Sequence, residues 1–124
     1  MNVSGIQAQN NYQNFKALHC DKEVLRSSFL NGNDVVYRYE QEEQQLKEMS
    51  KDIDLYIFPG LTPKSPARSK DMNAIRMIAY DPKKDPAIES SFCYAYLLEP
   101  HTLTRTAQDA ISALNNHAAI EDLG

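Results

Sequence analysis

Two strand-forming segments in the second half of the chain constrain the fold most. Residues 90–98 combine aromatic and aliphatic side chains in the run SSFCYAYLL, and residues 73–80 place apolar side chains on both faces of an extended chain. The intervening residues 81–86 contain two aspartates and two prolines, which favour a turn, and the prolines cannot donate to a ladder. The sequence therefore predicts an antiparallel hairpin, whose first strand lies inside a sheet or in an interface.

A third strand and a C-terminal helix complete this half of the chain. Residues 53–58 alternate apolar with polar side chains, and Pro59 and Gly60 are expected to end that strand. Residues 61–71 are predicted to form a loop, because prolines and small polar residues interrupt any pattern. The clearest helix is predicted over residues 104–120, where small and aliphatic side chains recur at spacings of three and four: Ala107, Ala110, Ile111, Leu114 and Ala118.

The N-terminal part is predicted to begin with a helix. Over residues 11–30, large apolar side chains recur at spacings of three, four and seven: Tyr12, Phe15, Leu18, Leu25 and Phe29. Alternatively, Asp21 caps a second, shorter helix over residues 22–30. Gly32, which lies between two asparagines, supplies a stop or a turn.

Residues 34–51 are compatible with two structures. The run VVYRY at 35–39 is β-branched and aromatic, which favours a strand, whereas residues 40–51 consist of strong helix formers. A short strand followed by a helix is the prediction. One long helix capped by Asp34 is the alternative.

These elements together predict an α+β fold. Helices at both ends and strands in the middle favour a central antiparallel sheet of three to four strands, with the N- and C-terminal helices packed on one face. The other face would be open or covered by a partner. The chain has 124 residues, the length of one domain, which we expect to occupy residues 11–120 between a flexible N-terminus at 1–10 and a frayed C-terminus at 121–124.

The charge balance argues against several classes of partner. The formal net charge is −4 at pH 7, whereas a nucleic-acid-binding surface is normally basic. The same balance argues against contact with anionic lipid, and no apolar run reaches the length of a membrane span. The N-terminal segment lacks the hydrophobic core of a secretory signal. We therefore expect a cytoplasmic protein, with export without a cleaved signal peptide as the alternative.

No motif in the sequence specifies a reaction. The three histidines, His19, His101 and His117, lack the spacing of metal ligands, and no glycine-rich phosphate loop is present. Cys20 and Cys93 are expected to be reduced and buried, although Cys93 with His101, or Cys20 with His117, could meet in space as a nucleophile pair. We therefore predict no catalytic residue, no metal site and no cofactor.

Charge is segregated along the chain. Residues 34–54 hold seven acidic and three basic side chains, a balance of −4, which a solvated helix face explains. Residues 59–76 carry the opposite balance of +3, because the segment contains one acidic residue, Asp71, and four basic residues: Lys64, Arg68, Lys70 and Arg76. This proline-containing segment is predicted to be an exposed loop. It is a solvated linker, a contact for phosphate groups or an acidic partner, or a kinase substrate at Thr62 or Ser65.

Tyrosines supply a candidate contact surface. In the predicted strands, Tyr37 and Tyr39 share one face, and Tyr94 and Tyr96 share another. Tyrosine and arginine dominate protein interfaces, although strand propensity and core packing also explain tyrosines in strands. The candidate binding residues are Tyr37, Arg38, Tyr39, Tyr94 and Tyr96 on the strands, and Lys64, Arg68, Lys70 and Arg76 in or beside the basic loop.

Three functional hypotheses follow from this surface. The leading one is a non-enzymatic protein-interaction module of the inhibitor, adaptor, chaperone or secreted-effector type, which binds a protein partner or a second copy of itself. The alternative is a protein, including an enzyme, that binds a small anionic ligand or a nucleotide through the same residues. The third is binding of single-stranded nucleic acid by base stacking, which the net charge of −4 disfavours.

Overall fold

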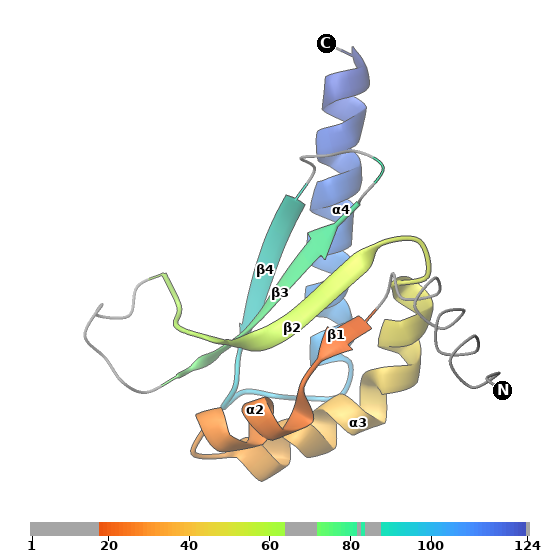
Figure 1. The fold of residues 1–124 in the computed structure, drawn as a ribbon. Coiled ribbons are helices and arrows are strands. Elements are labelled where there is room, and N and C mark those ends of the chain that lie inside the picture. Colours follow the sequence, from red (N-terminus) through yellow and green to blue (C-terminus); the bar gives the residue numbers. More distant parts are fainter. Residues whose placement is uncertain (1–17, 64–71, 82, 84–87, 124) are drawn as a thin grey trace, which may run out of the picture.

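The computed structural model places a sheet against a layer of helices (Figure 1). The structure describes residues 18–63, 72–81, 83 and 88–123, and for residues 117–123 only the course of the helix. The elements in chain order are β1 (Leu18–Cys20), α2 (Lys22–Ser28), α3 (Gly32–Met49), β2 (Asp54–Gly60), β3 (Ala74–Tyr80), β4 (Ile88–Tyr94) and α4 (Thr102–Leu123). The predicted α+β fold is confirmed.

The four strands of the sheet lie in the order β1-β2-β3-β4. β2 pairs antiparallel with β3, and β3 pairs antiparallel with β4, so the predicted hairpin is confirmed. β1, which was not predicted, pairs parallel with β2 and makes the sheet mixed. A parallel pair needs a long crossover connection, and α2 and α3 supply it.

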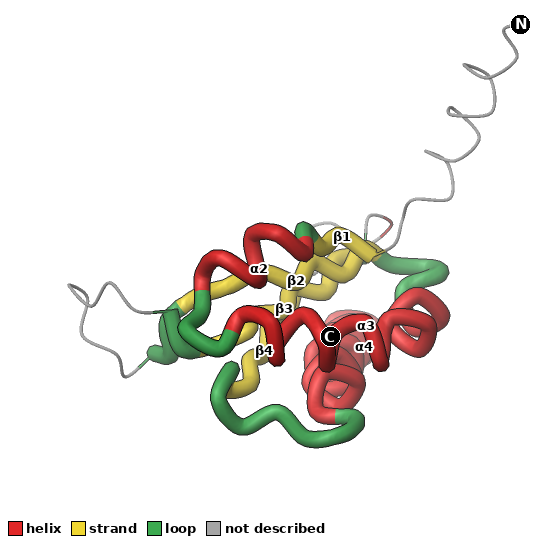
Figure 2. Tube along the Cα trace, turned by 90° about the horizontal axis from the view of Figure 1, so that it is seen from below, coloured by secondary structure: helices red, strands yellow, loops and turns green. Residues whose placement is uncertain are grey.

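One face of the sheet carries the hydrophobic core, because successive side chains of a strand point to opposite faces. Leu55 and Ile57 of β2 lie in register with Ala79 and Met77 of β3, and all four are buried. Helices α3 and α4 lie side by side against this face, and α2 packs beside α3 (Figures 1 and 2). The predicted packing of the helices on one face is confirmed.

Small side chains bring α4 close to β4. Ala107 and Ala110 are fully buried, and the Ser91 hydroxyl of β4 donates a 2.6 Å hydrogen bond to the carbonyl oxygen of Thr106. The helix begins at Thr102 rather than at residue 104, and it continues to Leu123 rather than ending at residue 120. None of the described helices is both long enough and apolar enough to cross a membrane.

The prediction of one helix over residues 11–30 is wrong in the part that the structure describes. Leu18–Cys20 is strand β1, and the carboxylate of Asp21 then caps α2 by accepting hydrogen bonds from two backbone N–H groups. The alternative of a shorter helix capped by Asp21 is the observed one, although it ends at Ser28. Pairing with β2 overrides the helical spacing at residues 18–20. Residues 11–17 lie outside the described residues.

The prediction of a strand at residues 35–39 is also wrong, because α3 is one continuous helix. Val35, Tyr39 and Leu46 are separated by four and seven residues, so they share one face of the helix, and all three are buried. Burial of this stripe outweighs the modest strand preference of the VVYRY run. The alternative of a single helix is correct, with Asn31 rather than Asp34 at its N-cap.

Two strand boundaries differ from the predictions. β2 continues through Pro59 and Gly60, which were expected to end it. β1 pairs only with residues 55–57. On the β1 side of β2, Pro59 therefore has no described strand beside it, and the hydrogen bond that proline cannot donate is not required there. β4 runs from Ile88 to Tyr94, so it begins before residue 90, and residues 95–98 follow the strand rather than belonging to it.

A buried carboxylate joins α3 to the start of α4. Glu42 is only 3% exposed, and its Oε1 accepts hydrogen bonds from the backbone N–H of Thr104 (2.8 Å) and from the Thr104 hydroxyl (2.7 Å). N–H groups in the first turn of a helix lack partners within the helix, and the helix dipole favours an anion there. Glu42 therefore caps α4 from the neighbouring helix and fixes the two helices relative to each other.

We expect Glu42→Ala to lower the free energy of unfolding by about 1–2 kcal/mol. The variant loses both hydrogen bonds to Thr104, and removal of the buried Oε2, which has no hydrogen-bond partner among the described residues, offsets part of that loss. Equilibrium urea unfolding measures the change. Glu48→Ala is the matched control, because it makes the same substitution at an exposed position of α3 and should change stability by less than about 0.5 kcal/mol. Equal losses in the two variants would contradict the capping role of Glu42.

Candidate interaction surface

The face of the sheet opposite the core, here called the open face, is lined by aromatic and aliphatic side chains. The residues that alternate with the core residues along the strands are His19, Asp54, Tyr56, Phe58, Gly60, Ala74, Arg76, Ile78, Tyr80, Ile88, Ser90, Phe92 and Tyr94. Tyr56 is 39% exposed, Phe58 37%, Tyr94 38% and Ile88 53%. A solvated face of an antiparallel sheet normally carries polar side chains, so this surface departs from the usual pattern.

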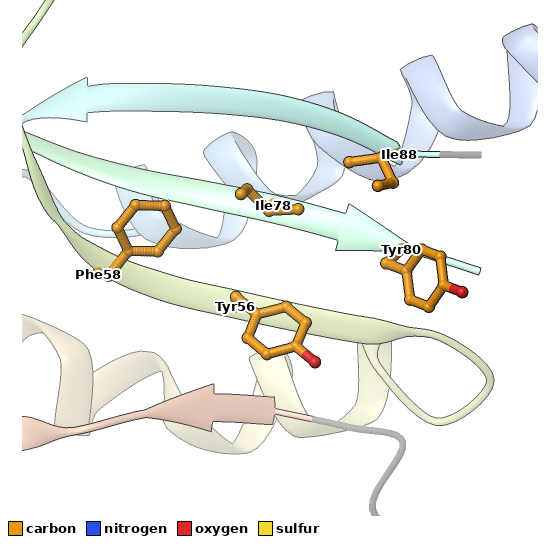
Figure 3. A pocket seen from close by; sticks show the side chains of 5 residues that line it. All are labelled: Tyr56, Phe58, Ile78, Tyr80 and Ile88. Atoms are coloured by element: carbon orange, nitrogen blue, oxygen red, sulfur yellow. The ribbon is translucent and has the colours of Figure 1, made fainter. Parts of the chain in front are cut away.

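Five of these side chains surround a shallow hollow of about 480 Å³. Tyr56 and Phe58 come from β2, Ile78 and Tyr80 from β3, and Ile88 from β4. All five stand on one side of the sheet, with helices behind the strands (Figure 3). Apart from the two tyrosine hydroxyls, these side chains are apolar. The hollow therefore fits an apolar side chain better than a charged group.

His19 of β1 supports one wall of this hollow. Its ring stacks on the ring of Tyr56, with the centroids 4.3 Å apart and the planes 12° from parallel. Nε2 of His19 lies 2.9 Å from Oδ1 of Asp54, which fixes the ring from the other direction. His19 and Tyr56 are register partners on neighbouring strands, so the pairing of β1 with β2 creates the stack.

A row of touching rings continues the open face beyond the hollow. Arg76 lies in register with Phe58 on one side and Phe92 on the other. Its guanidinium carbon is 5.2 Å from the centroid of the Phe92 ring, within the range of a cation–π contact. Phe92 makes an edge-to-face contact with Tyr94 at 5.7 Å, and Tyr94 contacts Tyr96 at 5.3 Å. The hollow and this row of rings therefore share the open face with Arg76.

Gly60 leaves the space that the Arg76 side chain occupies. A methyl group at Gly60 would lie 2.6 Å from Cγ of Arg76, far closer than two carbon atoms approach without repulsion. The Nη1 atom of Arg76 is buried and has no hydrogen-bond partner among the described residues. The position of the guanidinium group therefore depends on the absence of a side chain at Gly60.

The structure brings together only part of the predicted site. Arg76 and Tyr94 lie on the open face, and Tyr96 lies in the turn after β4 against the Tyr94 ring. Three residues of the basic loop lie outside the described residues: Lys64, Arg68 and Lys70. Of the two predicted kinase targets, Thr62 is buried, which places its hydroxyl out of reach of a kinase, and Ser65 lies outside the described residues.

The predicted placement of Tyr37, Arg38 and Tyr39 on a sheet is wrong, because all three belong to α3. Residues two apart on a helix point in different directions, so Tyr39 is 2% exposed in the core while Tyr37 is 59% exposed. The guanidinium carbon of Arg38 is 5.9 Å from the Tyr37 ring. With Tyr96, Tyr37 and Arg38 line a second hollow of about 270 Å³ beside the turn that follows β4.

The sequence did not locate the residues that build the first hollow. None of the five lining residues was among the candidate binding residues, although the two apolar faces of residues 73–80 were a signal for an interior strand or an interface. The two apolar faces identify β3 alone and do not show which residues of other strands lie beside it. The partners of Ile78 on β2 and β4 depend on the register, which a single strand does not reveal.

No family model matches the chain. No curated protein and no solved structure matches it either. The open face is therefore interpreted from its own residues, their contacts and their exposure.

Both cysteines are free and half-buried, and the pKa of each thiol is raised. Burial raises the pKa of the Cys20 thiol to about 11, although a hydrogen bond with Tyr39 offsets part of the shift. Burial also raises the pKa of Cys93. Because the thiolate is the reactive form, these shifts disfavour the cysteine–histidine pairs considered from the sequence. Within the described residues, no group of three His, Cys, Asp or Glu side chains is placed to hold a metal ion.

The raised pKa of Cys20 should make stability depend on pH. The folded-state pKa of about 11 lies above the ordinary value of 9.0, so the folded protein holds the thiol proton more tightly than the unfolded chain does. The contribution of Cys20 to the free energy of unfolding is therefore fully present below pH 9 and falls as the pH rises towards 11. Urea unfolding at several pH values across this window measures the loss, and Cys20→Ala should make the decline shallower. An unchanged decline in the variant would show that other groups cause it.

We expect Gly60→Ala to lower the free energy of unfolding by about 1–3 kcal/mol, because overpacking forces the Arg76 stem to move. The same substitution in an Arg76→Ala background should cost much less, since the blocking atoms are gone. A double-mutant cycle from urea unfolding measures this coupling. Additive losses would mean that Gly60 is required for another reason.

Proposed function

We propose that this protein is a non-enzymatic protein-interaction module that binds a protein partner through the open face of its sheet. The observation that carries the proposal is the apolar hollow on that face, between Tyr56, Phe58 and Ile88. A hollow of this kind accepts an apolar side chain of a partner, as the core of a protein interface does. Inhibitors, adaptors, chaperones and effectors act through such binding without chemistry of their own.

The composition of the open face supports a protein partner. Interface cores are enriched in aromatic residues and arginine and depleted in lysine and carboxylates. The open face has aromatic rings on every strand, and Arg76 lies among them. The carboxylate of Asp54 at its margin is already engaged by His19. Removal of such rings from water contributes about 25 cal/mol for each Å² of apolar surface.

A small anionic ligand is the second candidate. It is favoured by Arg76, which lies next to the rings of Phe92 and Tyr94, where a nucleotide base could stack. The apolar lining of the hollow has no role in this hypothesis. A protein partner accounts for both the hollow and the arginine, so it is the preferred function.

A charge in the hollow should abolish partner binding. Tagged protein is used to capture partner proteins from the cells that make it. We expect Ile88→Glu to reduce the recovery of a true partner at least tenfold, because the partner would bury the glutamate without a compensating charge. Val24→Glu is the control, because Val24 is a similarly exposed apolar residue on α2. Quantitative mass spectrometry compares the captures, and circular dichroism confirms that both variants are folded.

Light scattering on the purified protein shows whether the partner is a second copy. A monomeric protein whose captured proteins do not change in Ile88→Glu would contradict the proposal. Thermal stabilisation by a nucleotide that is lost in Arg76→Ala would instead favour the second candidate.

A further inference from the structure

Arg76 is the only lysine or arginine that the described structure places on the open face, and the carboxylate of Asp54 on the same face is already bonded to His19. It comes from β3, an interior strand, and its cross-strand neighbours are Phe58 and Phe92. Gly60 provides the space for its aliphatic stem, and the Phe92 ring lies 5.2 Å from the guanidinium carbon. Its place is thus built from three strands.

The Arg76 guanidinium lacks an acidic partner within the described part of the chain. The ion pairs there involve His19, Lys22 and Arg26, and Nη1 of Arg76 makes no hydrogen bond. A guanidinium group has five donors arranged to hold a carboxylate, and a buried donor without an acceptor is destabilising. Nη1 itself is buried, so a bound carboxylate would neutralise this half-buried cation through the other nitrogen atoms of its guanidinium group.

We propose that the partner occupies the open face with a segment in which a carboxylate, held by Arg76, stands next to an apolar side chain that enters the hollow. This inference rests on the proposed function and specifies the chemistry of the partner. Arg76 and Ile78 point to the same face of β3, and their Cα atoms are about 7 Å apart, the distance between alternate residues of a strand. The Arg76 stem lies over Gly60, which pairs with Ala74, so the guanidinium group is farther from the hollow than the Cα spacing alone. In an extended segment of the partner, the acidic and apolar residues are therefore about two to four positions apart.

A second copy of this chain fits the open face less well. A second copy would bring a second Arg76 to the interface, and like charges repel. On the described part of that face, the carboxylate of Asp54 is already bonded to His19. The charge therefore favours one acidic segment of a different protein.

Peptide display on the immobilised full-length protein tests the inference. A library of random 12-residue peptides should yield sequences with Asp or Glu about two to four positions from Leu, Ile or Phe. Affinity of the best peptide should fall at least tenfold when its acidic residue is changed to the amide, which requires no change in the protein. Arg76→Gln should cause a similar loss, and combining both changes should add little. Arg105→Gln, at an exposed position of α4, is the matched control and should have no effect.

Three outcomes would overturn the inference. Peptides that bind through Ile88 but show no preference for an acidic residue would leave the proposed function standing and remove the role of Arg76. A homodimer that Ile88→Glu dissociates would identify a second copy as the occupant. Failure of the library to yield any peptide that binds the wild-type protein would rule out a short acidic segment, while the capture experiment would still decide whether a protein partner exists.

Discussion

The two-residue repeat of β3 is the constraint on which the rest of the structure depends. It sends Ile75, Met77 and Ala79 towards the helices, and Arg76, Ile78 and Tyr80 away from them. Slippage by one residue would place the arginine in the core and expose Met77. Pairing of β3 with both β2 and β4 fixes the register, so the core and the open face are set by the same hydrogen bonds.

Local patterns were sufficient for the elements whose neighbours are close in sequence. The β3–β4 hairpin and α4 follow from alternation and from spacings of three and four, and the α+β fold follows from their order. The strand prediction for residues 35–39 was wrong because the intrinsic strand preference of these residues stabilises less than the burial of a helical stripe does. The strand Leu18–Cys20 was missed because it depends on a parallel partner more than thirty residues away in the sequence. Three residues are also too few to show a strand periodicity.

The candidate site was harder to predict than the fold. Tyr94 and Arg76 were identified by residue type, and both lie on the open face. Tyr37 and Arg38 were placed there by an incorrect strand and line a different hollow. The apolar side chains of the main hollow, such as Ile78 and Ile88, belong to residue types that usually lie in a core. Only the sheet register shows that they meet on the side away from the helices.

The stack of His19 on Tyr56 has a consequence for the thermodynamics of binding. A side chain that is free in solution loses rotational freedom when a partner arrives, at a cost of roughly 0.5–1.5 kcal/mol for each one immobilised. The Tyr56 ring is already held by His19, and His19 is held by Asp54. Phe92 and Tyr94 restrict each other in the same way. Much of the entropy cost of ordering these side chains is thus incurred when the sheet folds. The open face then has its binding shape before a partner arrives.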